Sequence, residues 1–395
     1  MPVQSQLIAE HDDAARRLIE QAGDDAAVSP DVEYLAWGDA AAVVATYGVI
    51  ELEYGSIRRG AGIIDQAGRG TLRITGADRI TFLNDLVTQE LTDLQPGGQR
   101  QAFWLNRKGR IEADLTVAAT ETACLLILDR LVAPTVREAL ESYHFAEDVE
   151  IEDVSDECHH LGIHGRQATA FLADRLDDDV PPGVGEARSG TIADVPVTIG
   201  HDPVTGHPGY DVICPASAVT TVWRALLAAP GDDGGIQARP LGWFAFNMAR
   251  IEAGRPLFNV DFGPTTLPHE SGLLAERVSF TKGCFPGQEV VARMEHLGQP
   301  KQMLVGLRPT GDHLPASEAR VFAPPKEDEG SFGAVVGAVT SSAPSPLLGS
   351  VPIAFAMVKR GHASEGTAVR VEAEGEIVDA TITPLFHVRE VLEGG

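Results

Sequence analysis

The sequence predicts an α+β fold that ends in a small antiparallel β-barrel. Up to about residue 299, helical stretches such as 241–253 alternate with short strands and turns. Residues 302–391 instead show five strand-like runs, punctuated by Pro, Gly and Ser, and no helix of convincing length. A chain of 395 residues is long enough for two or three domains. We therefore predict a helix and connector at 1–33, an α+β region at 34–299 and a barrel at 300–395.

The first predicted element is an acidic amphipathic helix at 4–22. Short strands follow a polar connector at 24–33, and one of these strands is predicted at Ile50–Tyr54, where apolar and acidic residues alternate. A Gly-rich turn into a strand is expected at Arg58–Asp65. This turn contains no GxGxxG and no GKS or GKT, so a nucleotide phosphate loop is not supported.

A β-hairpin is predicted across the turn at Lys108-Gly109. On its second arm, Glu112 and Asp114 share one face of the strand because successive side chains point to opposite sides. Two carboxylates on one face can form an acid/base pair. They can equally be the solvated side of a half-buried sheet, which is the commoner case.

The composition points to a soluble cytoplasmic protein with an acidic surface. The formal charge is −26, and the 57 acidic residues are spread along the chain, a pattern that suits adaptation to high salt. This charge argues against non-specific nucleic-acid binding, and no apolar run is long enough to span a membrane. The four cysteines form no CxxC pair, so neither a disulfide framework nor a zinc ribbon is indicated.

The densest group of reactive residue types is F-T-K-G-C-F-P-G-Q-E-V-V-A-R at 280–293. Lys282 is one of five lysines and Cys284 one of four cysteines. A helix is predicted after Gly287 and is expected to stop at Gly298, so Cys284 precedes a helix N-terminus. That position and the charge of Lys282 both favour the thiolate. A lone Cys is more often a small buried residue, but these polar neighbours are poor core material and reverse that expectation.

Two further groups carry candidate chemistry. Glu252 lies in R-I-E-A-G at the end of an apolar helix. It is either a surface carboxylate paired with Arg250 or Arg255, which composition alone favours, or a pocket carboxylate that accepts two hydrogen bonds from an amino-pyrimidine ring. His159, His160 and His164 could suggest metal ligands, but adjacent strand residues face opposite sides and no Cys or carboxylate completes a set, so we predict no metal.

These segments together resemble a known family. K-G-C-F-P-G-Q-E at 282–289 is similar to the K-G-C-Y-x-G-Q-E signature of the YgfZ family of tetrahydrofolate-binding proteins, with Phe285 in place of Tyr. The wider superfamily includes the glycine-cleavage T-protein, an aminomethyltransferase. The opening segment of the T-protein resembles the residues that start at Arg59, and its hairpin resembles those that start at Ala102. Its R-[LI]-E-A-G element resembles the residues from Arg250, and its final strands resemble the region 350–384. The resemblance covers most of the chain from about residue 45 to 390.

The resemblance implies a ring of three subdomains around a channel that holds tetrahydrofolate. It implies that Glu252 grips the pterin ring beside Arg250. Cys284 with Lys282 would supply a redox or one-carbon-accepting thiol. The loop that carries this thiol would be ordered by Gln288, Glu289 and Arg293.

One difference from the T-protein pattern distinguishes the YgfZ family from the aminomethyltransferases. The T-protein hairpin ends in D-D-L, where this chain has Ala113 and Asp114, and the T-protein lacks the K-G-C signature. Both points favour a YgfZ-like role in iron–sulfur cluster assembly or repair, linked to tRNA modification, with iron–sulfur proteins as partners. The main rival is an aminomethyltransferase that uses Asp114 and a lipoyl carrier protein. A third possibility is a non-catalytic, folate-dependent scaffold.

Overall fold

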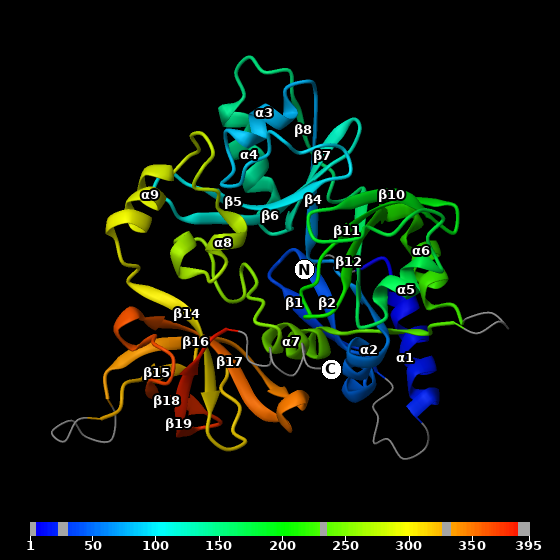
Figure 1. The fold of residues 1–395 in the computed structure, drawn as a ribbon. Coiled ribbons are helices and arrows are strands. Elements are labelled where there is room, and N and C mark those ends of the chain that lie inside the picture. Colours follow the sequence, from blue (N-terminus) through cyan, green and yellow to red (C-terminus); the bar gives the residue numbers. More distant parts are fainter. Residues whose placement is uncertain (1–4, 23–30, 230–234, 326–332, 386–395) are drawn as a thin grey trace. The chain divides into compact units, whose positions relative to one another are not determined.

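The structure is a computed structural model that describes residues 5–22, 31–229, 235–325 and 333–385. Residues 24–30 of the predicted connector lie outside the described residues. The chain divides into two compact units (Figure 1). Unit 1 comprises Met1–Asp85, Glu90–Ala102 and Asp114–Phe246, and unit 2 comprises Leu86–Gln89, Phe103–Ala113 and Asn247–Gly395. The domain limits predicted at 33 and 299 stay a prediction.

A six-stranded sheet forms the centre of unit 1, in the order β10-β11-β12-β9-β3-β13. Only the β3–β13 pair is parallel. The apolar residues of this sheet are buried together with those of three helices, which gives one continuous core. The strands are β10 Ala187–Ile192, β11 Val195–His201, β12 Gly209–Pro215, β9 Cys158–His164, β3 Ala61–Asp65 and β13 Ala238–Pro240; the helices are α1 Ile8–Ala22, α5 Ala168–Ala173 and α6 Val219–Leu227.

The amphipathic pattern at 4–22 predicts an N-terminal helix, and α1 lies within these residues. Leu7, just before the helix, and Ala14 and Leu18 within it are buried in the core of unit 1. On the outer side, Arg224 of α6 makes two hydrogen bonds to the Glu10 carboxylate, at 2.9 and 2.6 Å. The apolar stripe and this ion pair together fix α1 against the rest of the unit.

A five-stranded sheet has the order β5-β6-β7-β4-β8. Along β6, Ile111, Ala113 and Leu115 are buried, whereas Glu112 and Asp114 are half-buried. The predicted alternation of this hairpin arm is therefore confirmed. The strands are β5 Gln99–Leu105, β6 Ile111–Ala119, β7 Ala123–Asp129, β4 Arg69–Thr75 and β8 Glu150–Asp153. Unit 1 also contains α3 Arg79–Asn84, α4 Ala133–Tyr143 and a two-stranded sheet of β1 Glu33–Trp37 and β2 Ala41–Thr46.

The strand predicted at Ile50–Tyr54 is wrong, because these residues begin helix α2, Ile50–Arg59. The alternating I-E-L-E-Y pattern fits a strand, yet one of its acidic residues is fully buried. The Glu53 carboxylate accepts hydrogen bonds from Thr46 Oγ1 at 2.7 Å, from the Tyr47 amide at 2.8 Å and from the Gly242 amide at 2.8 Å. Burial raises the pKa of Glu53, and these bonds oppose the shift. Tertiary contacts thus decide the structure of this segment.

A closed six-stranded barrel forms the C-terminal part of unit 2, drawn from yellow to red in Figure 1. Its order is β14-β17-β16-β15-β18-β19, and β14 also pairs with β19, which closes it. The α+β class and the antiparallel barrel are therefore confirmed. The short strand β15 is the one that the sequence reading missed. The bounds are β14 Gln302–Pro309, β15 Arg320–Phe322, β16 Val335–Ser345, β17 Val351–Lys359, β18 Ala368–Ala373 and β19 Glu376–Thr383.

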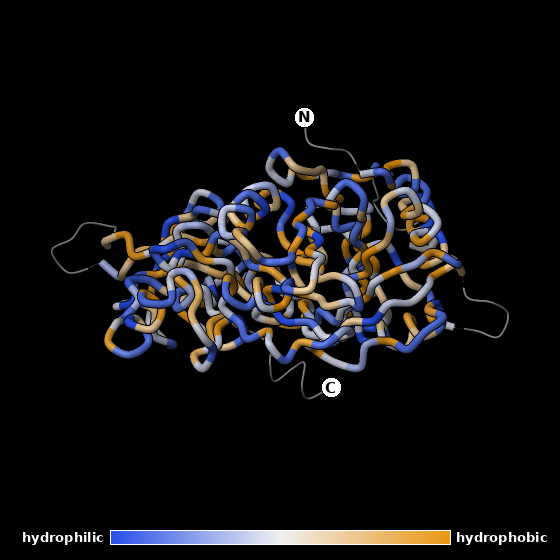
Figure 2. The backbone as a smooth tube through the Cα atoms, turned by 90° about the horizontal axis from the view of Figure 1, so that it is seen from above, coloured by the Kyte–Doolittle hydropathy of each residue, from blue (hydrophilic) through white to orange (hydrophobic). Residues whose placement is uncertain are grey.

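The remaining helices lie between the sheets and the barrel in sequence. They are α7 Trp243–Glu252, α8 Leu274–Arg277 and α9 Gln288–Leu297. The described part of the chain also has single turns of 3₁₀ helix, which are η1 Ala216–Ala218, η2 Pro268–Glu270, η3 Pro346–Leu348 and η4 Arg360–His362. Apolar and polar segments alternate along the backbone tube in Figure 2. Among the described residues, no helix has both the length and the apolar character that crossing a membrane demands.

Candidate functional site

Cys284 lies on an exposed loop directly before helix α9. The helix begins after Gly287, which has a φ of +80°, and it ends at Gly298, as the sequence predicts. A Cβ atom on Gly287 would lie 2.5 Å from the carbonyl oxygen of Asn106. The close approach and the positive φ both require glycine here. The loop that carries the thiol therefore packs tightly against the hairpin turn between β5 and β6.

Lys282 attaches the other end of the same loop. Its Nζ donates hydrogen bonds to the carbonyl oxygens of Val87 at 2.7 Å and Gln89 at 3.1 Å, and it lies 5.5 Å from the centre of the Phe285 ring. The ammonium group is thus used to hold the backbone of the loop in place. An electrostatic effect of Lys282 on the Cys284 thiol stays a prediction.

The three polar residues predicted to order the loop differ in their surroundings. The side-chain oxygen of Gln288 accepts a hydrogen bond from the Phe285 amide at 3.2 Å, which closes the turn. Glu289 and Arg293 lie on the exposed side of α9, and Val291 is the buried residue of that helix. Gln288 therefore shapes the loop from within, whereas Glu289 and Arg293 face solvent.

Glu252 is the last residue of α7 and has no exposed surface. Its Oε1 accepts a hydrogen bond from Ser345 Oγ at 2.6 Å and another from the Leu347 amide at 3.3 Å. The interpretation of Glu252 as a surface carboxylate is therefore wrong. A buried charge needs such partners because desolvation is costly. The carboxylate is consequently fixed by the corner between β16 and η3.

Arg250, one half-turn earlier, is also fully buried, but it has a different partner. Its Nη1 donates to Asp261 Oδ2 at 2.6 Å and to the carbonyl oxygen of Arg255 at 3.1 Å. Burial lowers the pKa of Arg250, and Asp261 opposes that shift. The guanidinium group is thus committed to an internal ion pair, which favours a structural role over direct contact with a ligand.

Asp114 and Glu112 lie two residues apart on the half-buried face of β6. The Glu112 carboxylate accepts a hydrogen bond from the indole nitrogen of Trp104 at 3.3 Å. Asp114 belongs to unit 1, whereas Glu252 and Cys284 belong to unit 2. Within unit 2, the structure places Arg250 with Glu252 on one helix turn, and it places Lys282 and Cys284 on one loop that leads into Gln288, the first residue of α9.

Sequence reasoning missed a buried cluster around Asp65 in unit 1. The carboxylate is 2.7 Å from His159 Nε2 and 3.2 Å from His11 Nε2, and it accepts a hydrogen bond from Ser5 Oγ at 2.5 Å. Burial acts to raise the pKa of Asp65, but the charge of His159 and the bonds from both imidazoles hold it well below its usual range. No local sequence pattern predicts this cluster, because its residues come from three segments that are far apart in the sequence.

The other two histidines of β9, His160 and His164, are also buried inside the protein. His160 Nδ1 lies 3.0 Å from Asp211 Oδ2, and its Nε2 lies 2.7 Å from Thr71 Oγ1. His164 is fully buried, and within the described part of the chain neither of its ring nitrogens has a hydrogen-bond partner. Burial lowers the pKa of His164 to about 4. His159 and His160 thus each pair with a different carboxylate.

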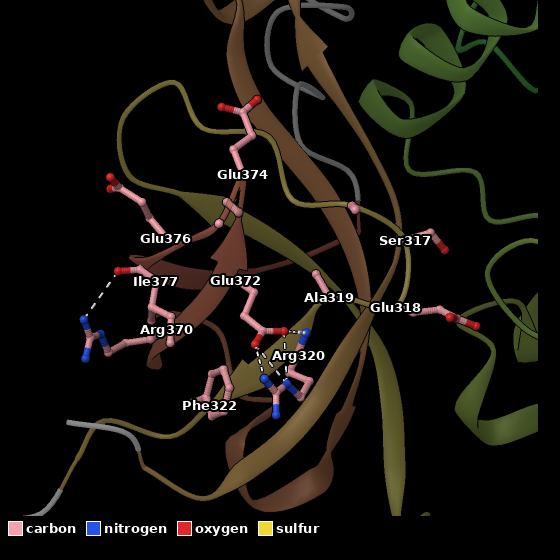
Figure 3. A pocket seen from close by; sticks show the side chains of 13 residues that line it. Ser317, Glu318, Ala319, Arg320, Phe322, Arg370, Glu372, Glu374, Glu376 and Ile377 are labelled. Atoms are coloured by element: carbon pink, nitrogen blue, oxygen red, sulfur yellow. Dashed lines mark hydrogen bonds and ion pairs between the residues drawn. The ribbon is translucent and has the colours of Figure 1, made fainter. Parts of the chain in front are cut away.

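A depression on the barrel has an acidic rim, shown in Figure 3. Arg320 and Glu372 form an ion pair across it, with Nε 2.9 Å from Oε1, and the Arg320 guanidinium lies over the Phe322 ring. None of the predicted site residues is among the described residues that line this depression. Its Arg320–Glu372 ion pair lies at the solvent-exposed surface, where such pairs contribute little, and the depression has no connection with the predicted chemistry.

Comparisons with known proteins agree over nearly the whole chain. Residues 38–282 match the family model described as the GCVT N-terminal domain, and residues 302–388 match the glycine cleavage T-protein C-terminal barrel domain. A protein from Streptomyces coelicolor named aminomethyltransferase is 31% identical over 348 residues, covering 86% of this chain and 90% of that protein. One of the same name from Geobacillus thermodenitrificans is 30% identical, covering 85% and 89%.

A solved structure shows the same fold. The crystal structure of glycine cleavage system aminomethyltransferase T from Bartonella henselae superposes with a TM-score of 0.80 and covers 98% of each chain, at 23% sequence identity. The two matched domains together include the six-stranded and five-stranded sheets and the closed barrel. The chain therefore belongs to the GCVT family, with its N-terminal domain followed by the T-protein C-terminal barrel.

Proposed function

We propose that this protein is a tetrahydrofolate-dependent aminomethyltransferase. The observation that carries the proposal is the match to relatives of that name over about nine tenths of their length, including both family domains. In the proposed reaction, the carbon of an aminomethyl group on a dihydrolipoyl carrier loses its bonds to sulfur and to the amine nitrogen, and it forms two new bonds, to N5 and N10 of tetrahydrofolate. The two protons displaced from these nitrogens leave with the thiol and the ammonia. The products are methylenetetrahydrofolate, ammonia and the free dihydrolipoyl thiol.

The residues of the chain can be given roles in this reaction. Glu252 presents a buried carboxylate, which suits the paired N–H donors on the amino-pyrimidine edge of a pterin. Asp114, half-buried on β6, is the group that we assign to proton transfer at the reacting nitrogen. Arg250 supports Glu252 indirectly, because its pairing with Asp261 fixes the last turn of α7.

A turnover assay tests this proposal directly. Purified protein is incubated without oxygen with tetrahydrofolate and an aminomethyl-lipoyl carrier, and methylenetetrahydrofolate and ammonia are measured. Asp114→Asn is expected to lower kcat by about 10²-fold or more, the usual scale for loss of a general acid/base. Glu112→Gln is the matched control on the same strand face, and it should retain most of the rate. Absence of turnover in a wild-type protein that binds tetrahydrofolate would refute the transferase function.

A YgfZ-like role in iron–sulfur cluster assembly or repair is the second candidate. Cys284 is exposed on a loop held at both ends, within K-G-C-F-P-G-Q-E, and Ala113 stands where the transferase has the first carboxylate of its pair. An exposed thiol on a rigid loop suits redox or transfer chemistry. These observations favour a function beyond that of the aminomethyltransferases.

Complementation separates the two candidates. A strain that lacks the gene is supplied with wild type, Cys284→Ser or Asp114→Asn, and the activity of an iron–sulfur enzyme and the modification of tRNA are measured. The YgfZ-like role predicts failure of Cys284→Ser and success of Asp114→Asn. Cys158→Ser is the control, because Cys158 lies on β9, away from the loop in sequence. Full activity of Cys284→Ser would remove this candidate.

Tetrahydrofolate binding underlies both candidates and also a non-catalytic scaffold. Anaerobic titration with tetrahydrofolate measures the affinity of wild type and of Glu252→Gln. We expect Glu252→Gln to weaken binding at least tenfold, since hydrogen bonds to a charged group are among the stronger ones. Binding without turnover, with stable capture of assembly proteins, would favour the scaffold. Equal affinity of both proteins would contradict the assignment of Glu252.

A further inference from the structure

We propose that Ser345 is a positioning residue that orients the Glu252 carboxylate and thereby sets the selectivity for ligands with a 2-amino-pyrimidine edge. This inference rests on the proposed binding of tetrahydrofolate through Glu252. It adds a residue from the barrel to a recognition element that the sequence places wholly on α7.

The contact itself is short and buried. Ser345 Oγ donates to Glu252 Oε1 at 2.6 Å, and both residues have no exposed surface. The Leu347 amide donates to the same oxygen at 3.3 Å, so one corner of the barrel supplies two donors to one carboxylate oxygen. Charge-assisted hydrogen bonds of this kind are stronger than neutral ones and hold their partners in one geometry.

Ser345 is held by its own backbone. It is the last residue of β16, where it pairs with Val351 of β17, and its carbonyl oxygen accepts a hydrogen bond from the Ser350 amide at 2.7 Å. A serine side chain has a single torsion between its hydroxyl and that fixed backbone. A glutamate side chain has three, so the serine constrains the glutamate and not the reverse.

The orientation matters because of the ligand chemistry. A 2-amino-4-oxo-pyrimidine presents two adjacent N–H donors in the plane of the ring. A carboxylate accepts both only when its own plane coincides with that of the ring, as in bidentate pairs with guanidinium groups. A carboxylate that rotates freely loses this preference, because it spends much of its time in planes that meet only one donor.

The same region provides a matched control. Ser342 also lies on β16, and its hydroxyl donates to the carbonyl oxygen of Pro315 at 2.5 Å. Ser342→Ala therefore deletes a serine hydroxyl and its hydrogen bond from the same strand without touching Glu252. A loss caused only by damage to β16 would be shared by Ser342→Ala and Ser345→Ala.

The experiment measures binding selectivity in the full-length protein. Anaerobic titrations give the dissociation constants of tetrahydrofolate and of its 2-desamino-2-methyl analogue for wild type, Ser345→Ala, Ser345→Thr and Ser342→Ala. Wild type should prefer tetrahydrofolate by at least tenfold, since the analogue lacks one donor. Ser345→Ala should reduce that preference to about threefold or less. Ser345→Thr, which keeps the hydroxyl, and Ser342→Ala should both retain it.

The outcomes separate this inference from the proposed function. If wild type binds neither ligand, the proposed function and the inference both fail. If Glu252→Gln abolishes the preference and Ser345→Ala retains it, the role of Ser345 alone is refuted. An equal loss of affinity for both ligands in Ser345→Ala, with the ratio unchanged, also refutes it. Should Ser345→Ala fail to fold, Ser345→Cys supplies the same test, because a thiol is a much weaker donor.

Discussion

Asp65 in unit 1 and Asp261 in unit 2 are both buried carboxylates with several partners, but the cations that balance them differ. Asp65 is bound by His11 and His159, together with Ser5. Asp261 is bound by Arg250 at 2.6 Å, by the Leu257 amide at 2.8 Å and by two hydroxyl groups of β16. An arginine keeps its charge across the working pH range, whereas the ordinary pKa of the histidine side chain as a residue type lies close to neutrality. The comparison therefore predicts that the two units respond differently to pH and to mutation.

The largest effect is expected for Asp261→Asn. This change removes the negative charge and leaves the guanidinium of Arg250 buried without its counter-ion. Breaking a buried ion pair on one side typically costs about 3–5 kcal/mol. Chemical denaturation at pH 7, followed by a probe in unit 2, should show a loss of stability of this size.

Ser341→Ala is the graded control for that change, since it removes one neutral donor to Asp261 and keeps the ion pair. Its cost should be about 1–2 kcal/mol. A loss below about 1 kcal/mol for Asp261→Asn would contradict the view that this carboxylate compensates a buried charge.

The second effect is a loss of stability in mild acid, expected in unit 1. Burial lowers the pKa of His164 to about 4, below its ordinary value of 6.5. Only the unfolded chain takes up the proton as the pH falls from 6.5 to 4, so the folded state loses about 3 kcal/mol over that window. Urea titrations between pH 8 and pH 4.5 measure this slope.

His164→Phe isolates the contribution of that residue. The variant has no titrating group at this position, so the acid-dependent loss should shrink by most of the stated amount. His201 and His207 also have a pKa lowered by burial, and their effect should persist in the variant. An unchanged pH dependence in His164→Phe would show that His164 is not the sensitive group.

The third effect is the release of the N-terminal helix in Asp65→Asn. The variant keeps an oxygen acceptor for Ser5 and the imidazoles and leaves no guanidinium buried without its counter-ion, so we expect a smaller cost than for Asp261→Asn, about 1–3 kcal/mol. Because His11 lies on α1, amide hydrogen exchange within this helix should accelerate more than exchange in the sheet. Uniform exchange changes across unit 1 would argue against a local clamp.

The pH dependence of Asp65 follows from the direction of its shift. The pKa of the folded state lies below that of the unfolded state. The stability that the carboxylate contributes is therefore present above about pH 4 and is lost as the pH falls through the lower, folded value. Asp65→Asn should remove this strongly acidic part of the unfolding profile and leave the window between pH 6.5 and 4 in place.

The smallest effect is expected for an exposed ion pair. Arg320 and Glu372 lie together on the barrel surface in Figure 3, where solvent and salt screen their attraction. Glu372→Gln should change the stability by no more than about 1 kcal/mol. Thermal unfolding at low and high salt measures it. A loss of stability larger than this would mean that the geometry of an exposed ion pair can matter as much as the burial of Asp65 and Asp261 does.

Strongly periodic segments could be predicted from the sequence. The helix after Gly287 and its end at Gly298 follow from apolar spacing and from glycine punctuation. Five of the six barrel strands follow from alternation and turn residues. These features depend on neighbours within a few positions, so the local pattern contains the necessary information.

Features set by distant contacts could not be predicted. The segment at Ile50–Tyr54 has strand-like alternation, yet the Glu53 carboxylate is buried and accepts hydrogen bonds from residues 46, 47 and 242. The partner of Glu252 lies 93 positions further along the chain. The strand β15 spans only three residues, too few for a period to be recognised. Motifs in the sequence predict the site residues, but the groups that hold those residues in place are set by the fold.

The closure of the barrel has a consequence for truncated forms of the protein. Because β14 pairs with both β17 and β19, every strand of the barrel has two neighbours. A chain that stops before Glu376 would lack β19 and would leave β14 and β18 with unsatisfied edges. Such edges recruit strands from other molecules. A late stop codon would therefore produce a self-associating polypeptide and not merely a shorter, weaker version of the native one.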